Sequence, residues 1–94
     1  MKNYEIMFIV KPLEEEATNA VITKFETLIT ANGGTVEKID RWGKRRLAYE
    51  VKDFIDGFYV LMHFASAPTV IAELDRVMKI TEDVIKHMII RKEE

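Results

Sequence analysis

The spacing of apolar residues switches between two periods along this chain, and the order of the switches limits the possible folds. Residues 4–10 point alternately to two faces, with Tyr4, Ile6, Phe8 and Val10 on one and Glu5, Met7 and Ile9 on the other. The run is rich in β-branched and aromatic residues, which is the pattern of a β-strand. Residues 13–32 place apolar side chains every three or four positions, which predicts an amphipathic helix. Gly33 and Gly34 can close that helix in a left-handed conformation. The chain therefore begins with a strand and a helix.

The second half repeats this alternation with one additional strand. Residues 35–52 have the pattern of an extended segment. Val36 and Ile39 have opposite parity, which indicates either a β-bulge between them or a strand that changes face, and we favour the bulge. Residues 53–57 (DFIDG) predict a hairpin turn, and residues 58–64 alternate again. Pro68 suits the first position of a second helix, with Ser66 as a candidate cap, and this helix should end near Ile80. Residues 84–91 predict the last strand.

Ninety-four residues are too few for two cores, so we expect one domain covering residues 1–94. The order strand, helix, strand, strand, helix, strand predicts an α+β ferredoxin-like split βαβ fold (βαββαβ). Right-handed crossovers put both helices on one face of a four-stranded antiparallel sheet, with the first and third strands in the centre. By parity, one set of residues faces the helices: Ile6, Phe8, Val10, Val60, Met62 and Phe64. The other set lines an open face: Glu5, Met7, Ile9, Tyr59, Leu61 and His63.

The open face is the first candidate site, because contiguous apolar patches often mark partner surfaces. Its apolar residues can equally be shielded by long neighbouring side chains, so both interpretations stay open. Tyr59 and His63 suggest base stacking of the kind found on RRM sheets. The sequence GFYVLMHF disfavours this, since it lacks the preceding basic residue and has Tyr59 where the RRM signature has a small one.

The second candidate site is a basic run at residues 38–46 around the only tryptophan, Trp42. Its basic residues outnumber Glu37 and Asp40; they are Lys38, Arg41, Lys44, Arg45 and Arg46. Arginine binds phosphate in a bidentate geometry, and its plane stacks on aromatic rings and bases. The alternative is an edge strand whose charges deter aggregation. We favour a role in binding over protection of an edge strand, because a glycine in a strand, here Gly43, often marks a bulge or a close approach, which protection does not require.

The third candidate site comprises the two ends of the chain, where Lys86, His87, Arg91 and Lys92 lie on or after the last strand. Lys2 and Tyr4 of the first strand are expected beside them. Solvated terminal side chains are the more common explanation, and phosphate contact is the alternative.

Catalytic and metal-binding functions find little support. Acidic KPLEEE stands where a phosphate-binding loop would follow the first strand, and there are no cysteines and two histidines. We therefore expect no enzyme, cofactor or metal, and no small-molecule substrate. The remaining alternative is a ferredoxin-like dimeric small-molecule-binding protein or enzyme. The N-terminal apolar run is too short for a signal peptide or membrane span, so we expect a cytoplasmic protein.

Four segments together resemble the bacterial small-subunit ribosomal protein S6 family: YEIMFIVKP, WGKRRLAYEV, DFIDGFYVL and ELDRVMKITEDVIKHMIIR. The resemblance covers essentially the whole chain. It implies a non-catalytic ribosomal protein that binds the central domain of 16S rRNA together with ribosomal protein S18. It also implies roles for two groups of residues. Arg41, Trp42, Arg45 and Arg46 would form the hairpin surface facing the protein partner and RNA, and Lys2, Tyr4, Lys86 and Arg91 would face rRNA.

The net charge of −2, from 14 basic and 16 acidic residues, is unusual for an independent RNA binder. The resemblance accounts for it, because a protein that binds RNA as half of a heterodimer can rely on a basic partner for counterion release. Many family members carry a longer C-terminal tail. This sequence ends at Glu94, so we expect contacts from such a tail to be absent or replaced.

Overall fold

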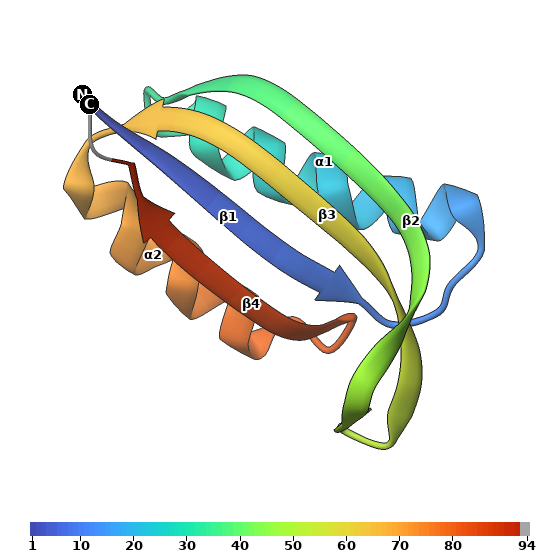
Figure 1. Cartoon of the computed structure of the whole chain (residues 1–94). Coiled ribbons are helices and arrows are strands. Elements are labelled where there is room, and N and C mark those ends of the chain that lie inside the picture. The colour runs from blue at the N-terminus through green and yellow to red at the C-terminus, as the bar shows by residue number, and fades with distance from the viewer. Residues whose placement is uncertain (93–94) are drawn as a thin grey trace.

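The computed structural model describes residues 1–92 and contains the expected order of elements (Figure 1). They are β1 (Lys2–Val10), α1 (Glu15–Ala31), β2 (Thr35–Val51), β3 (Phe54–Ser66), α2 (Pro68–Ile80) and β4 (Val84–Arg91). The last two residues, Glu93 and Glu94, lie outside the described part. The strands form one antiparallel sheet in the order β2-β3-β1-β4, and both helices cover the same face of it (Figure 1). The predicted ferredoxin-like split βαβ fold, with β1 and β3 in the centre, is confirmed.

The main core lies between the helices and the sheet. The six residues predicted to face the helices are each fully buried: Ile6, Phe8, Val10, Val60, Met62 and Phe64. From α1 the core takes Val21, Ile22, Phe25 and Ile29, and from α2 it takes Leu74 and Met78. The polar residue Thr18 is also buried on α1.

The second helix starts as predicted with Pro68 in its first turn, but the prediction that Ser66 caps it is wrong. The N-cap residue is Ala67, whose methyl side chain cannot accept a hydrogen bond from the backbone N–H groups of the helix. Ser66 is the last residue of β3 and is fully buried there, and its hydroxyl donates to the Ala67 carbonyl at 3.2 Å. The proline therefore marks this boundary more reliably than the nearby serine does.

The turn between β2 and β3 also differs from the prediction. Val51 pairs with Phe54, so the loop is Lys52-Asp53, and both of these residues have positive φ (49° and 70°). This is the left-handed pair that a tight two-residue hairpin needs, although neither residue is glycine. Gly57 belongs to β3 instead. A Cβ atom at Gly57 would lie 2.3 Å from Ile9 Cγ2, so this glycine serves close packing and not a turn.

The strand β2 departs from regular pairing at three places. The predicted bulge is confirmed by a register shift between Val36 and Lys38, and further shifts occur between Arg41 and Gly43 and after Arg46. Bulges increase local twist, and the end of the β2–β3 hairpin extends away from the sheet (Figure 1). At the base of this extension a second, smaller apolar cluster joins Leu47 to Ile9 and Ile85.

Candidate interaction surfaces

The pairing of β2 with β3 separates the basic hairpin residues onto two sides of the sheet. Arg41 lies opposite Val60 and Arg46 opposite Asp56, which places both on the side of the helices. Arg45 lies opposite Gly57, on the open side, where Gly43 is opposite Tyr59. The four residues expected to form one hairpin surface thus do not share a face.

On the open side, Trp42, Arg45 and Tyr59 form a group that we call the Trp42 cluster. The rings of Trp42 and Tyr59 are nearly parallel, 6° apart, with centroids separated by 6.4 Å. The Arg45 guanidinium carbon lies 5.9 Å from the Trp42 ring centroid, and Arg45 Nε donates to the Trp42 carbonyl at 3.4 Å. Trp42 remains 46% exposed. The cluster therefore presents a flat aromatic surface next to a fixed positive charge.

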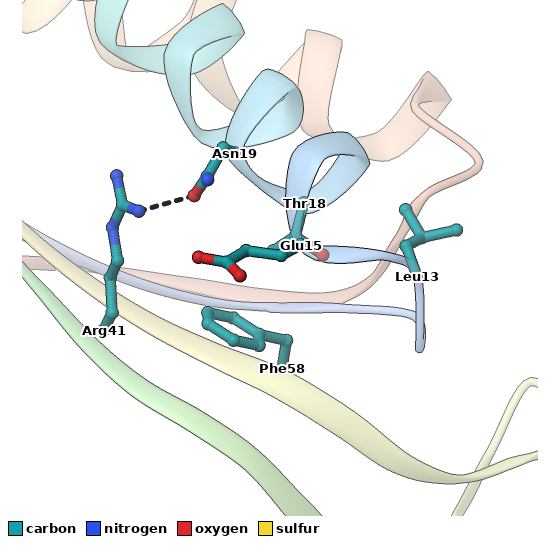
Figure 2. A pocket seen from close by; sticks show the side chains of 6 residues that line it. All are labelled: Leu13, Glu15, Thr18, Asn19, Arg41 and Phe58. Carbon is teal, nitrogen blue, oxygen red and sulfur yellow. Dashed lines mark hydrogen bonds between the residues drawn. The ribbon is translucent and has the colours of Figure 1, made fainter.

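Arg41, on the other side, turns towards α1. Its guanidinium donates to Asn19 Oδ1 at the rim of a pocket of about 270 Å³ between α1 and the sheet (Figure 2). The pocket is lined by Leu13, Glu15, Thr18, Asn19, Arg41 and Phe58. Among these lining residues there is one carboxylate and one guanidinium, but no histidine, cysteine or serine. The pocket is the feature that the small-molecule alternative requires, yet its lining holds none of the usual pairs of a nucleophile with histidine.

The centre of the open face carries apolar side chains and one ionic group. Met88 and Ile90 of β4 are 47% and 44% exposed, whereas Met7 and Leu61 are partly buried. His63 Nε2 lies 3.7 Å from Glu5 and 3.9 Å from Asp40, and Lys92 Nζ lies 2.8 Å from His63 Nδ1. Because His63 is held in this ionic group, and Tyr59 lies against Trp42, the two do not form an RRM-like pair of free stacking rings.

The residues expected to face rRNA fall at opposite ends of β1. Lys86 lies opposite Ile9, and its ammonium contacts Tyr49 of the hairpin, 3.1 Å from the hydroxyl and 5.4 Å from the ring centroid. Arg91 lies opposite Tyr4 at the other end, with exposed Lys2 close by on β1. Tyr4 itself is 7% exposed and stacks on Phe64 at 5.7 Å. Its ring belongs to the core, so the exposed charge of the predicted rRNA-facing residues at that end comes from Lys2 and Arg91.

Two contacts here were not expected from the sequence. Tyr59 was considered for base stacking but not as the neighbour of Trp42, and Tyr49 was not singled out although it meets Lys86. Both contacts depend on long-range strand register, which local patterns do not report. Within residues 1–92, no group of three or more His, Cys, Asp or Glu side chains is arranged to hold a metal ion. Neither described helix has the length and apolar character needed to cross a membrane.

Comparison with known proteins identifies the family. The family model described as ribosomal protein S6 matches residues 3–91. Two proteins named small ribosomal subunit protein bS6 are each 53% identical over the whole chain. The match covers 97% of the protein from Moorella thermoacetica and 100% of the protein from Desulforamulus reducens. These relatives are ribosomal proteins, which confirms the predictions that the chain is not an enzyme and belongs to the cytoplasmic ribosome.

Solved structures agree with this assignment. The crystal structure of 30S ribosomal protein S6 from Thermotoga maritima superimposes with a TM-score of 0.92 at 29% identity, covering 97% of this chain and 87% of that one. The C-terminal domain of the MgtC protein from Mycobacterium tuberculosis has a TM-score of 0.64 at 16% identity, covering 100% of this chain and 90% of that one, which is a likeness of fold alone. The family model, the relatives and the Thermotoga maritima structure together show that the chain belongs to the ribosomal protein S6 family.

Proposed function

We propose that this chain is a structural protein of the small ribosomal subunit that binds the central domain of 16S rRNA together with ribosomal protein S18. Family membership supports the ribosomal part of this proposal. The observation that carries the RNA-binding part is the Trp42 cluster, in which an exposed aromatic ring and an arginine lie together on a projecting hairpin. Such groups suit contact with phosphates and bases.

The charge of the chain supports binding in company with a partner. With a net charge of −2, the free protein gains little from releasing the counterions of RNA. Two groups of its exposed positive charges lie on the hairpin at residues 41–46 and at the end of the sheet with Lys2 and Arg91, and others, such as Lys24 and Arg76, are spread over the helices. A basic partner would supply the remaining electrostatic attraction, while this chain contributes shape and a few fixed contacts.

The separation of the hairpin residues assigns them different roles within this proposal. Arg45 and Trp42 face the same side as the partly exposed apolar residues of the open face, whereas Arg41 and Arg46 face the side of α1. Lys2 and Arg91 provide phosphate contacts at one end of the sheet, and Lys86 provides one at the other. Tyr4 contributes by packing beneath the end of the sheet that carries Lys2 and Arg91, because its ring is buried against Phe64.

The test reverses two hairpin charges with Arg45→Glu and Arg46→Glu in one protein. Both side chains are exposed, so the fold should survive, which circular dichroism and the thermal unfolding midpoint will check. Assembly is then measured by pull-down with ribosomal protein S18 and a transcript of the 16S rRNA central domain. We expect loss of the three-component complex, because each reversed charge removes an attraction and adds a repulsion.

A matched control makes the same change of charge on the helices, with Lys24→Glu and Arg76→Glu. Both residues are exposed; Lys24 donates to Thr81 and lies 5.8 Å from the centroid of the Phe25 ring, and Arg76 pairs with Glu73 within α2. These exposed contacts contribute little to stability, so the control should fold and assemble. Equal assembly of the hairpin variant and the unaltered protein would contradict the role of the hairpin. Failure of the unaltered protein to form the complex would contradict the proposed function itself.

A further inference from the structure

We propose that the Trp42 cluster binds one unpaired nucleotide of RNA, with the base stacked on the exposed part of the Trp42 ring and the phosphate held by Arg45. This inference rests on the proposed function, since it assumes that RNA is the ligand. It adds a defined ligand, a single-stranded nucleotide, and a division of labour between the two side chains. It also separates this part of the hairpin from Arg41 and Arg46, which face the other side of the sheet.

The cluster is held in place before any ligand arrives. Trp42 lies at a register shift of β2, and its ring runs parallel to that of Tyr59 on the neighbouring strand. Arg45 is fixed by its hydrogen bond to the Trp42 carbonyl and by its position near the ring. That hydrogen bond occupies Nε, one of the five N–H donors of a guanidinium, and the others sit on the two terminal nitrogens. Side chains ordered in advance lose less entropy on binding.

A nucleotide fits this arrangement better than an acidic protein side chain does. A carboxylate would use only the arginine, whereas a nucleotide offers a flat base for the ring and a phosphate for the guanidinium. Asp40 lies on the same side of β2, but its carboxylate contacts other side chains, with Lys38 at 3.6 Å and His63 at 3.9 Å. The base must be unpaired, because a base within a duplex is stacked on its neighbours and cannot lie on a protein ring.

The chain carries its own probe, because Trp42 is the only tryptophan. Its fluorescence, excited where tyrosine absorbs weakly, is followed at low salt while the full-length protein is titrated with a short single-stranded oligouridine. The same titration is made with an RNA duplex and with inorganic tripolyphosphate. We expect saturable quenching by the single strand alone. A response to tripolyphosphate that equals the response to oligouridine would overturn the stacking part of the proposal.

Three variants test the division of labour, with fluorescein-labelled oligouridine and anisotropy as the readout. Trp42→Leu should weaken binding roughly tenfold, since a stacked base contributes on that scale, and Trp42→Phe should recover most of it. Arg45→Gln should weaken binding and reduce its dependence on salt. The matched control is Arg76→Gln, which removes one exposed charge from α2, where Arg76 pairs with Glu73 and lies outside the hairpin. The control should bind nearly as the unaltered protein does.

Equal losses for Arg45→Gln and Arg76→Gln would overturn the inference, because they would indicate attraction by charge without a defined site. The inference also fails if Trp42→Leu weakens assembly with ribosomal protein S18 but leaves oligouridine binding unchanged, since the cluster would then be a protein contact. Assembly with S18 and the central-domain transcript is measured in parallel. If the unaltered protein assembles while oligouridine leaves Trp42 fluorescence unchanged, this inference is wrong and the proposed function stands.

Discussion

The two faces of the sheet are built from the same strands, yet they differ in nearly every property. On the helix-covered face, every second residue of β1 from Ile6 to Val10 and of β3 from Val60 to Phe64 is fully buried in one apolar cluster. The open face is divided among a small apolar cluster around Leu47, an ionic group around His63 and the Trp42 cluster. One face is uniformly apolar and buried, and the other combines a small buried cluster with partly exposed groups.

This difference assigns stability to one face and recognition to the other. Burying apolar side chains among other apolar side chains is the main favourable term in folding, so the helix-covered face should hold the fold together. Residues on the open face that stay partly exposed contribute less to stability, and their side chains are available to a partner. Substitutions of similar size on the two faces should therefore have different consequences.

The largest expected effect comes from Phe8→Ala on the helix-covered face. Phe8 is fully buried and meets Phe25 edge to face at 5.6 Å, so truncation leaves a large cavity. We expect a loss of about 3–5 kcal/mol in the free energy of unfolding, measured by urea denaturation. On the open face, Leu61→Ala removes a partly buried side chain and should cost about 1 kcal/mol. Similar losses for the two variants would remove the distinction between the faces.

The next effect concerns the place where the hairpin meets the open face. In Gly57→Ala the added methyl group would lie 2.3 Å from Ile9 Cγ2 and 3.5 Å from Ile85 Cδ1. We expect a loss of about 1–3 kcal/mol in the free energy of unfolding from this overpacking. Faster amide hydrogen exchange in the hairpin beyond Gly57 should accompany it, because the apolar cluster around Leu47 would be displaced.

Gly43→Ala is the comparison for Gly57→Ala. Gly43 has no neighbouring atom within 4 Å of an added Cβ, but its φ is +85°. The expected cost is therefore backbone strain of about 1 kcal/mol, without loosening of the apolar cluster. If amide hydrogen exchange in the hairpin beyond Gly57 becomes faster in both variants, the close contact between Gly57 and Ile9 is not what anchors the hairpin.

The sequence was most informative where one face is uniform. Alternation in β1 and β3 predicted which residues face the helices, because only one register buries Phe8, Val60 and their neighbours together. It was least informative in the hairpin. The turn was placed at DFIDG because glycine is the usual turn residue, whereas the structure turns at Lys52-Asp53 and uses Gly57 for packing. The presence of a glycine in a sequence does not show whether it forms a turn or allows close packing.

The candidate site shows the same limit in another form. Each bulge in β2 reverses the side on which the following residues lie, so the faces of Arg41 and Arg45 depend on the number and position of the bulges. One bulge was predicted from Val36 and Ile39, but the shift at Trp42 has no apolar pattern to reveal it. The proximity of Tyr59 to Trp42 follows from that shift. Tyr4 lies near the start of the chain, yet it has the parity of the buried set, and its ring is 7% exposed.

The smallest expected effect compares the two histidines, one on each side of the sheet. On the helix side, His87 Nε2 lies 2.7 Å from Asp75 of α2, and this hydrogen bond, with help from Lys79, lowers the pKa of Asp75 below its ordinary value of 3.8. A carboxyl group with a lowered pKa in the folded protein stabilises it while ionised. That stabilisation is complete above the ordinary pKa and is lost as the pH falls through the lowered one.

We therefore expect Asp75→Asn to reduce the free energy of unfolding at pH 5, by about 1 kcal/mol or less because the carboxylate is partly exposed. The difference between Asp75→Asn and the unaltered protein should shrink as the pH is lowered towards and below the lowered pKa of Asp75. Urea denaturation across this range measures it. Glu5→Gln, beside His63 on the open face at the longer distance of 3.7 Å, is the comparison. A larger and more pH-dependent loss for Glu5→Gln would place the acid-sensitive contact on the open face and reverse the expected contrast.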